Sequence, residues 1–126
     1  MTARLEHVNV SVPDAGATAK VLCDLFGWKV RWKGGAIHDG QSVHVGDDHS
    51  YVALYSPSHE MIGNVMRYRQ YGGLNHIGVV VEDIDATEAK VTAAGYQTHS
   101  HADYEPGRRF YFDGPDGVEY EVVSYT

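Results

Sequence analysis

The first residues of the chain alternate between apolar and polar side chains with the two-residue period of a β-strand. Valines fill every second position of residues 8–12, and polar residues, beginning with His7, fill the positions between them. Residues 77–81 repeat the pattern of branched apolar side chains, and His76 precedes them. In each strand we expect the valine face to pack against a helix and the histidine face to look away from it.

A stretch with helical spacing follows each of these strands. In the first stretch Asp14 is a candidate N-cap and Gly27 a candidate stop. The buried stripe of this helix is expected to consist of Val21, Leu22, Leu25 and Phe26. In the second stretch the N-cap is either Asp83 or Asp85, the latter at the start of a sequence that resembles a capping box, and Gly95 ends the helix.

Three shorter strands are expected after each helix, because turn sequences rich in Gly and Asp divide the chain there. In the first half these strands are predicted at residues 36–38, 42–45 and 51–55, and in the second half at residues 97–101, 109–112 and 120–125. A linker at residues 57–73 joins the halves. One or two helical turns are predicted in it from Met61, Ile62, Val65 and Met66.

The two halves of the chain are copies of one βαβββ module. An offset of 69 residues aligns His7 with His76, and after the helices the offset becomes 68. Helices of slightly different length would produce this change. The repeat predicts an α+β fold in a single domain, with modules at about 1–56 and 74–126 joined by the linker at 57–73. We expect the paired modules to form an eight-stranded, cleft-shaped mixed sheet with the helices outside.

Composition excludes several functional classes. A formal net charge of −7 argues against nucleic acid as a partner, since phosphates attract clustered Lys and Arg. The apolar stretches are too short to span a bilayer, and the first residues lack the apolar core of a secretion signal. The single cysteine, Cys23, excludes an internal disulfide and fits a reducing compartment. We therefore expect a cytoplasmic protein that binds neither nucleic acid nor membranes.

Two histidines and one carboxylate are expected on the face of the sheet that the helices leave open. His7 and His76 occupy equivalent places in the two copies, whereas Glu121 of the last strand has Ala53 as its counterpart. A lone strand histidine is usually an ordinary surface or core group, but two at the same place in a repeat point to a metal. Two imidazoles and one carboxylate leave coordination positions open and suit Fe²⁺, Mn²⁺, Zn²⁺, Ni²⁺ or Co²⁺. The sequence predicts His7, His76 and Glu121 as ligands of such a divalent metal ion.

The remaining histidines are interpreted as ordinary surface or core groups: His38, His44, His49, His59, His99 and His101. His44 and His101 are the exceptions, as groups that support the metal site or bind substrate. Tyr51 and Tyr55, on the same face as Ala53, are candidates for an aromatic substrate wall, together with Trp32; ordinary sheet packing is the alternative for all three.

These patterns resemble the vicinal oxygen chelate superfamily, which includes glyoxalase I, extradiol dioxygenases, fosfomycin-resistance transferases and bleomycin-resistance proteins. The resemblance rests on the strand that opens with His7, on the sequence Asn-His-Ile-Gly-Val at residues 75–79, and on the Phe-Tyr-Phe-Asp-Gly-Pro-Asp-Gly sequence at residues 110–117 that precedes Glu121. It implies paired βαβββ modules around a divalent metal, with His7, His76 and Glu121 as its ligands.

The subfamilies fit the chain to different degrees. Ala53 occupies the position at which glyoxalase I typically has a fourth ligand, a glutamate. The extradiol signature needs a histidine shortly before Phe110-Tyr111, and His101 lies slightly too far upstream. Fosfomycin-resistance enzymes use His, His and Glu, and Tyr111 matches a tyrosine that they use near the phosphonate. In that interpretation Arg108 and Arg109 would supply the cationic pocket.

The leading hypothesis is a metal-dependent lyase or isomerase of the glyoxalase-like kind, with the metal acting as a Lewis acid on a small oxygenated substrate. Tyr111 and Glu121 are its candidate catalytic residues, and Tyr51, Tyr55, Arg109 and His101 are its candidate substrate-binding residues. The alternatives are an extradiol-type dioxygenase and a binding protein of the bleomycin-resistance kind without catalysis. A homodimer is expected, and the cleft is formed either within one chain or between two.

Overall fold

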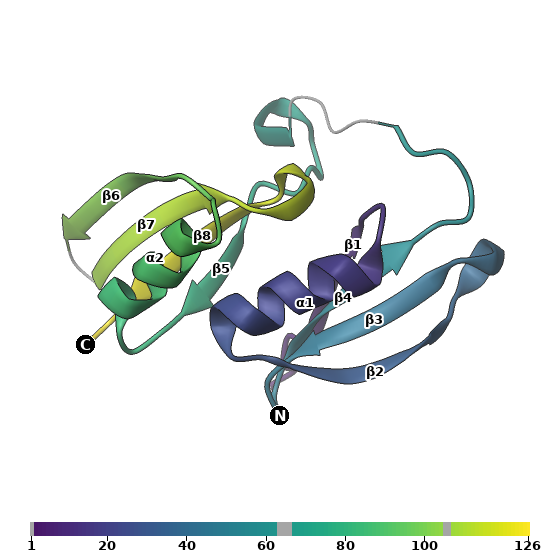
Figure 1. Cartoon of the computed structure of the whole chain (residues 1–126), viewed down its shortest axis with the longest axis horizontal. Helices are drawn as coiled ribbons and strands as arrows, with labels where there is room; N and C mark the ends of the chain where they lie inside the picture. Colours follow the sequence, from purple (N-terminus) through teal and green to yellow (C-terminus); the bar gives the residue numbers. More distant parts are fainter. Residues whose placement is uncertain (1, 63–66, 105–106) are drawn as a thin grey trace. The chain divides into compact units, whose positions relative to one another are not determined.

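The computed structural model of the chain describes residues 2–62, 67–104 and 107–126. The chain divides into two compact units, Met1–Ile62 and Gly63–Thr126, and the boundary falls inside the predicted linker. Each unit contains one α-helix and one four-stranded sheet (Figure 1). Within the described ranges, no helix has the length and apolar character needed to cross a membrane.

The first unit is a βαβββ module. Its elements are β1 (His7–Ser11), α1 (Ala15–Phe26), β2 (Lys29–Gly35), β3 (Gln41–Gly46) and β4 (Tyr51–Ser56), with a short 3₁₀ turn, η1, at Ile37–Asp39. The strands are ordered β1-β4-β3-β2. The first and last strands of the module pair in parallel and the other neighbours are antiparallel, so the sheet is mixed.

The second unit repeats this topology. Its elements are β5 (Ile77–Val80), α2 (Ile84–Ala93), β6 (Thr98–Tyr104), β7 (Gly107–Asp113) and β8 (Glu119–Ser124), with 3₁₀ turns η2 at Arg67–Arg69 and η3 at Pro115–Gly117. The order β5-β8-β7-β6, with β5 parallel to β8, matches the order in the first unit. The predicted α+β class and its paired βαβββ modules are confirmed.

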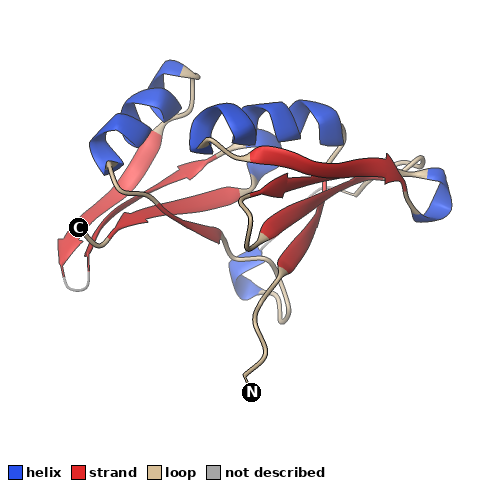
Figure 2. Ribbon diagram, turned by 90° about the horizontal axis from the view of Figure 1, so that it is seen from below, coloured by secondary structure: helices blue, strands red, loops and turns tan. Residues whose placement is uncertain are grey.

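Each helix covers one face of the sheet of its own unit, as Figure 2 shows. In β1 and the residue after it, Val10 and Val12 are buried while His7 is exposed, so the alternation has the predicted sense. In α1, Leu22 and Leu25 of the predicted stripe are buried, together with Ala15, Thr18 and Ala19. Val21 and Phe26 are only partly buried. The open face of each sheet carries the polar side chains that matter below.

The ends of α1 are as predicted. The side chain of Asp14 accepts a 3.0 Å hydrogen bond from the backbone N–H of Ala17, which satisfies one of the free donors of the first turn. Gly27, at φ 70°, ends the helix in the left-handed conformation that glycine adopts without strain.

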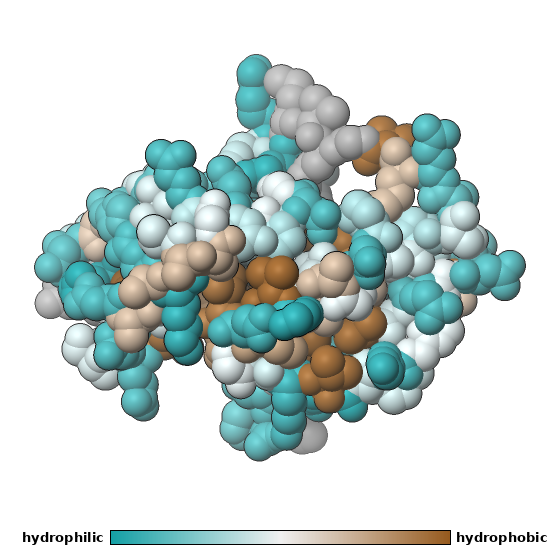
Figure 3. All heavy atoms as spheres, in the orientation of Figure 1, coloured by the Kyte–Doolittle hydropathy of each residue, from teal (hydrophilic) through white to brown (hydrophobic). Residues whose placement is uncertain are grey.

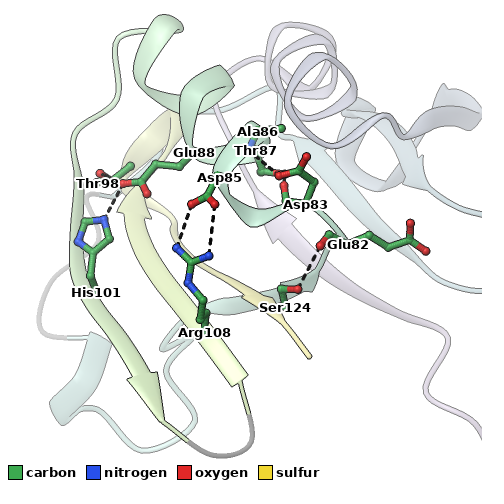
Figure 4. Close-up of polar contacts among 10 residues, drawn as sticks. All are labelled: Glu82, Asp83, Asp85, Ala86, Thr87, Glu88, Thr98, His101, Arg108 and Ser124. Atoms are coloured by element: carbon green, nitrogen blue, oxygen red, sulfur yellow. Dashed lines mark hydrogen bonds and ion pairs between the residues drawn. The ribbon is translucent and has the colours of Figure 1, made fainter. Parts of the chain in front are cut away.

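The N-cap of α2 is Asp83, and the alternative cap at Asp85 is wrong. The carboxylate of Asp83 accepts a 3.0 Å hydrogen bond from the N–H of Ala86 (Figure 4). Asp85 already lies in the first turn, where its carboxylate pairs with Arg108 of β7 at 2.9 Å. The helix therefore starts two residues earlier than the sequence resembling a capping box indicated, and Gly95 follows its C-cap with φ 97°.

The predicted strand at residues 36–38 is wrong, since β2 spans Lys29–Gly35 and residues 37–39 form η1. His38 and Asp39 have φ values of 56° and 58°, which exclude an extended strand. β2 is an edge strand with almost every residue exposed, so burial imposes no alternation of apolar and polar residues on its sequence, and no strand is predicted there.

Of the residues that predicted a helical turn in the linker, Val65 and Met66 lie outside the described residues, and Met61 and Ile62 are irregular. On the face drawn in Figure 3, polar side chains cover most of the surface.

Candidate metal centre

The second unit brings His76 and Glu121 together. Nε2 of His76 lies 3.1 Å from Oε1 of Glu121. His76 immediately precedes β5, and Glu121 lies opposite Gly78 in the parallel β5–β8 pair, so the two side chains leave the same face of the sheet. The exposed fractions of the two side chains are 31% and 13%, so the pair is mostly shielded from water.

The second ring nitrogen of His76 is also occupied. Nδ1 lies 2.7 Å from Oδ1 of Asn75, the side chain immediately before it. Because an amide oxygen only accepts, Nδ1 carries the proton and donates it to Asn75. The lone pair of a neutral imidazole is then on Nε2, the atom that faces Glu121. Metal-binding histidines commonly have their second nitrogen held in this way.

The two oxygens of Glu121 have different partners. Oε2 accepts a 2.8 Å hydrogen bond from Nη1 of Arg109 on β7, while Oε1 faces His76. The guanidinium of Arg109 also lies 5.0 Å from the ring centre of Tyr104. Arg109 therefore orients the carboxylate and leaves one oxygen for another cation.

Tyr111 completes this cluster. It lies opposite Glu121 in the β7–β8 pair, and its ring meets that of His76 edge-on at 5.5 Å. Burial raises the pKa of the Tyr111 hydroxyl, and the charge of the hydrogen-bonded Glu121 carboxylate raises it further. At neutral pH Tyr111 is therefore a protonated phenol, suited to donate a hydrogen bond rather than to act as a base.

The donors in this cluster fit a divalent metal ion. Imidazole nitrogen and carboxylate oxygen bind such ions at about 2.1 Å, so two of them at right angles are about 3 Å apart. The 3.1 Å separation of Nε2 of His76 and Oε1 of Glu121 has this size. The groups that hold the outer atoms, Asn75 and Arg109, are the kind of support that orients metal ligands.

The first unit holds His7 in an equivalent arrangement. Nδ1 of His7 lies 2.9 Å from Oε1 of Glu6, the preceding side chain, so in His7, as in His76, Nε2 is the nitrogen available to a metal ion. The His7 ring stacks on the Tyr51 ring with 4.8 Å between the ring centres, and the Tyr51 ring stacks on the His44 ring with 4.5 Å between their centres. Trp32 contacts His44 at 5.0 Å, so a row of rings crosses the open face of this sheet. Burial lowers the pKa of His44, and the positive charge of His7 lowers it further.

Ala53 and Tyr55 occupy the positions that the repeat indicated. Ala53 is buried on β4, with His44 and Asn9 as its register partners on either side. A methyl group there offers no ligand atom. The Tyr55 hydroxyl donates a 3.0 Å hydrogen bond to the carbonyl of Ile37, so this ring fixes the η1 turn.

His101 and Arg108 lie on the helix-covered side of the second sheet. His101 is paired with Glu88 of α2, and Arg108 with Asp85 (Figure 4). The His101 ring also stacks on Phe110, a core residue. The structure therefore does not bring His101 together with Glu121.

A β-bulge explains the position of His101. In the β6–β7 pair, His99 is opposite Tyr111 and Ala102 opposite Arg109, so two residues of β6 face the single residue Phe110. Ser100, the first of the two, has φ 57°. Regular alternation would place His99 and His101 on one face, but the bulge sends them to opposite faces.

Three residues near this cluster were given no role by the sequence. His99, Asp113 and Glu119 each offer a ligand atom, and these atoms lie within 4.8 Å of one another. Glu119 precedes Glu121 by two residues, so the alternation that selected Glu121 indicated the same face for Glu119. His99 gave no such signal, because its neighbours in sequence do not report the bulge.

Comparison with known protein families identifies the superfamily of the chain. Residues 4–122 match the family described as the Glyoxalase/Bleomycin resistance protein/Dioxygenase superfamily. The chain belongs to this superfamily. The match spans both βαβββ units, so the predicted resemblance to the vicinal oxygen chelate proteins is confirmed. A comparison with curated protein sequences finds no match.

Solved structures of superfamily proteins share the fold. A glyoxylase/bleomycin resistance protein/dioxygenase domain from Frankia sp. EAN1pec has a TM-score of 0.84 at 18% identity, covering 100% of this chain and 94% of that chain. The fosfomycin resistance protein FosX from Listeria monocytogenes has a TM-score of 0.74 at 17% identity, covering 100% and 96%. A FosX mutant from the same organism, complexed with Mn(II) and 1S,2S-dihydroxypropylphosphonic acid, has a TM-score of 0.72 at 16% identity, covering 98% and 93%.

Proposed function

We propose that this protein is a divalent-metal-dependent enzyme that acts on a small oxygenated molecule, with His7, His76 and Glu121 as the metal ligands. The observation that carries the proposal is the 3.1 Å approach of His76 Nε2 to Glu121 Oε1. Asn75 and Arg109 hold the other two atoms of this pair and leave these two as the available donors.

His7 enters the proposal through the repeat. It matches His76 in sequence, and each of the two histidines has its Nδ1 held by the side chain before it, Glu6 in one unit and Asn75 in the other. In both units Nε2 is therefore the nitrogen proposed to bind the metal. We also propose a homodimer, in which a second copy of the chain could equally supply the His7 ligand.

A divalent cation bound by these ligands would act as a Lewis acid on a substrate oxygen. Tyr111, whose raised pKa keeps its hydroxyl protonated at neutral pH, would donate a hydrogen bond to a substrate oxygen that becomes negatively charged. Arg109 keeps the Glu121 carboxylate in one orientation. This combination supports lyase or isomerase chemistry of the glyoxalase-like kind, in which a substrate oxygen gains negative charge and a proton moves. Tyr51 and the rings stacked beside it would contribute an aromatic surface for substrate.

The other enzymatic hypotheses have less support from the geometry. The FosX proteins are named for fosfomycin resistance, but here Arg108 pairs with Asp85 and Arg109 pairs with Glu121, so neither guanidinium is left to hold a phosphonate. An extradiol-type dioxygenase remains the enzymatic alternative, although His101 faces α2 rather than the metal cluster. Oxygen uptake with Fe²⁺ and a panel of catechols would identify that activity.

Metal binding by the full chain tests the proposal directly. The purified protein, stripped with chelator, is loaded separately with Mn²⁺, Fe²⁺, Co²⁺, Ni²⁺ and Zn²⁺, and its metal content is measured after gel filtration. Mn²⁺ is the first choice, because a FosX mutant of the same fold is complexed with it. His76→Ala is compared with His101→Ala, which removes a histidine of the same unit from the opposite face of the sheet.

We expect the wild type and His101→Ala to retain the same metal content, and His76→Ala to retain one equivalent less. Equal retention by all three proteins would overturn the proposal and favour a metal-free binding protein of the bleomycin-resistance kind. A loaded protein is then screened against hemithioacetals, hydroxyketones and epoxides. Light scattering tests the homodimer, and cell fractionation of the native protein tests the proposed cytoplasmic location.

A further inference from the structure

A second group of metal-ligand side chains lies on the open face of the same sheet. Asp113 of β7 and Glu119 of β8 are register partners, and His99 of β6 is opposite Tyr111, which precedes Asp113 by two residues on β7. One ligand atom from each of His99, Asp113 and Glu119 lies within 4.8 Å of the other two. The Tyr111 ring stacks on His99 at 6.3 Å and meets His76 at 5.5 Å, so it contacts both groups of ligands.

The outer atoms of these residues already have partners. Arg67 lies 3.4 Å from Oδ1 of Asp113 and 4.0 Å from Oε2 of Glu119, and it also donates to the carbonyl of Gly117. Nδ1 of His99 lies 2.9 Å from the hydroxyl of Ser100. One outer atom of Asp113 and one of His99 are therefore held by hydrogen bonds, and the charge of Arg67 lies near the outer oxygen of Glu119.

The inner atoms are short of partners. Nε2 of His99 and Oε1 of Glu119 are buried, and no residue that the structure describes hydrogen-bonds to either of them. Oδ2 of Asp113 lies 3.7 Å from Nε2 of His99, which is too long for a hydrogen bond. Glu119 is more than nine-tenths buried, so an unpaired oxygen there carries a large desolvation cost.

The charges also favour a cation. Two carboxylates face one guanidinium, so with a neutral His99 the group has one uncompensated negative charge. A proton on His99 would cancel that charge, but at 3.7 Å it would make no hydrogen bond to Asp113 and would leave Oε1 of Glu119 unpaired. A divalent ion would supply positive charge and a partner for the unpaired atoms of His99 and Glu119, since imidazole and carboxylate both bind first-row metals.

We propose that His99, Asp113 and Glu119 form a second site for a divalent transition-metal ion, separate from the His76–Glu121 centre and independent of its function. Each of the three residues contributes one inner atom, and hydrogen bonds with Arg67 and Ser100 hold the outer atoms of Asp113 and His99. The second unit then carries two metal sites on one face of its sheet, with Tyr111 between them.

Titration with Co²⁺ tests the second site. The full chain is stripped with chelator and titrated by calorimetry, and the visible absorption of bound Co²⁺ is followed in parallel. His99→Ala is compared with His101→Ala, two residues away on the opposite face of the sheet, and with His76→Ala. Glu119→Gln serves as a second variant that keeps the side-chain shape.

We expect His99→Ala to bind one Co²⁺ fewer than His101→Ala, and Glu119→Gln to bind at the second site at least about 100-fold more weakly than the wild type. His76→Ala should keep this site and lose the other. If His99→Ala and His101→Ala bind Co²⁺ with equal stoichiometry and affinity, the second site is excluded. In that case loss of binding only in His76→Ala would still support the proposed function, so the two proposals fail separately.

The thermal midpoint gives a readout for a variant that folds poorly. The metal-free wild type should have a lower midpoint of thermal unfolding than the Co²⁺-loaded wild type, and His101→Ala should show the same difference. Most of the contribution from the second site should be missing in His99→Ala. A metal-independent loss of stability in His99→Ala, with an unchanged Co²⁺ shift, would show instead that the group is only an ion-pair network.

Discussion

Arg109 donates a 2.8 Å hydrogen bond to Oε2 of Glu121, and both side chains are about 15% exposed or less. The guanidinium thus lies beside the carboxylate that we assign to the metal. It compensates the charge of the Glu121 carboxylate and restricts that carboxylate to one orientation, in which Oε1 faces His76.

Replacing Arg109 should destabilise the metal-free protein and make its stability depend on metal. Arg109→Gln leaves a mostly buried carboxylate without its partner, at a cost of about 2–4 kcal/mol in the free energy of unfolding. Mn²⁺ or Zn²⁺ should recover much of that loss, because the ion replaces the missing positive charge. Arg108→Gln is the matched control, since its exposed pair with Asp85 should contribute less than about 1 kcal/mol. Urea unfolding with and without metal measures both.

The Asn75 side chain should control metal affinity through His76. Asn75→Ala removes the acceptor that orients the imidazole, and we expect the affinity for the metal to fall about 10- to 100-fold. Asn75→Asp keeps an oxygen at this place and should retain affinity. An Asn75→Ala protein with unchanged affinity in calorimetry would argue that Nδ1 of His76 needs no partner.

Asp47 should make the first unit less stable in acid. Its carboxylate accepts hydrogen bonds from the backbone N–H groups of Ser50 and His49, which hold its pKa below the ordinary value for an aspartate. A carboxylate with a lowered pKa stabilises the fold above the unfolded value of about 3.9, and this stability is lost as the pH falls through the folded value. Asp47→Asn should therefore melt about 2 °C lower at pH 7 and match the wild type near pH 2.

Gly46, beside the turn that Asp47 stabilises, should not tolerate a side chain. A Cβ on Gly46 would collide with the carbonyl of Ser50 and the backbone of Tyr51, and these backbone atoms cannot move without disturbing the β3–β4 connection. Gly46→Ala should lower the free energy of unfolding by about 2–3 kcal/mol. Gly35→Ala, with open space around its Cβ, should change it by less than about 0.5 kcal/mol. Thermal melts of the two variants give the comparison.

Much of the fold could be predicted from the sequence because the module is repeated and its central strands alternate. The parallel strand that follows His76 and the helix capped by Asp14 were found by period and capping residues alone. Edge strands were placed less well. Nearly every residue of β2 is exposed, so burial does not impose on its sequence the alternation of apolar and polar residues that marks a half-buried strand.

The site could be predicted only in part, for a related reason. His76 was found because it repeats His7, and Glu121 because the last strand alternates regularly. The sequence named His101 as a substrate-binding candidate and gave His99 no role, because the faces on which the two lie depend on a bulge that leaves no pattern in the sequence of β6. The pairing of Arg109 with Glu121 likewise depends on the strand register, which single residues do not reveal.

The bulge in β6 rests on Ser100, whose positive φ is unusual for a residue with a side chain. It decides which of two nearby histidines faces the ligands on β7 and which faces α2. A mutation at Ser100 that abolishes this backbone shape would restore regular alternation and place both histidines on one face of the sheet. The backbone torsion of a single residue on an edge strand thus decides whether the proposed second site has its imidazole ligand.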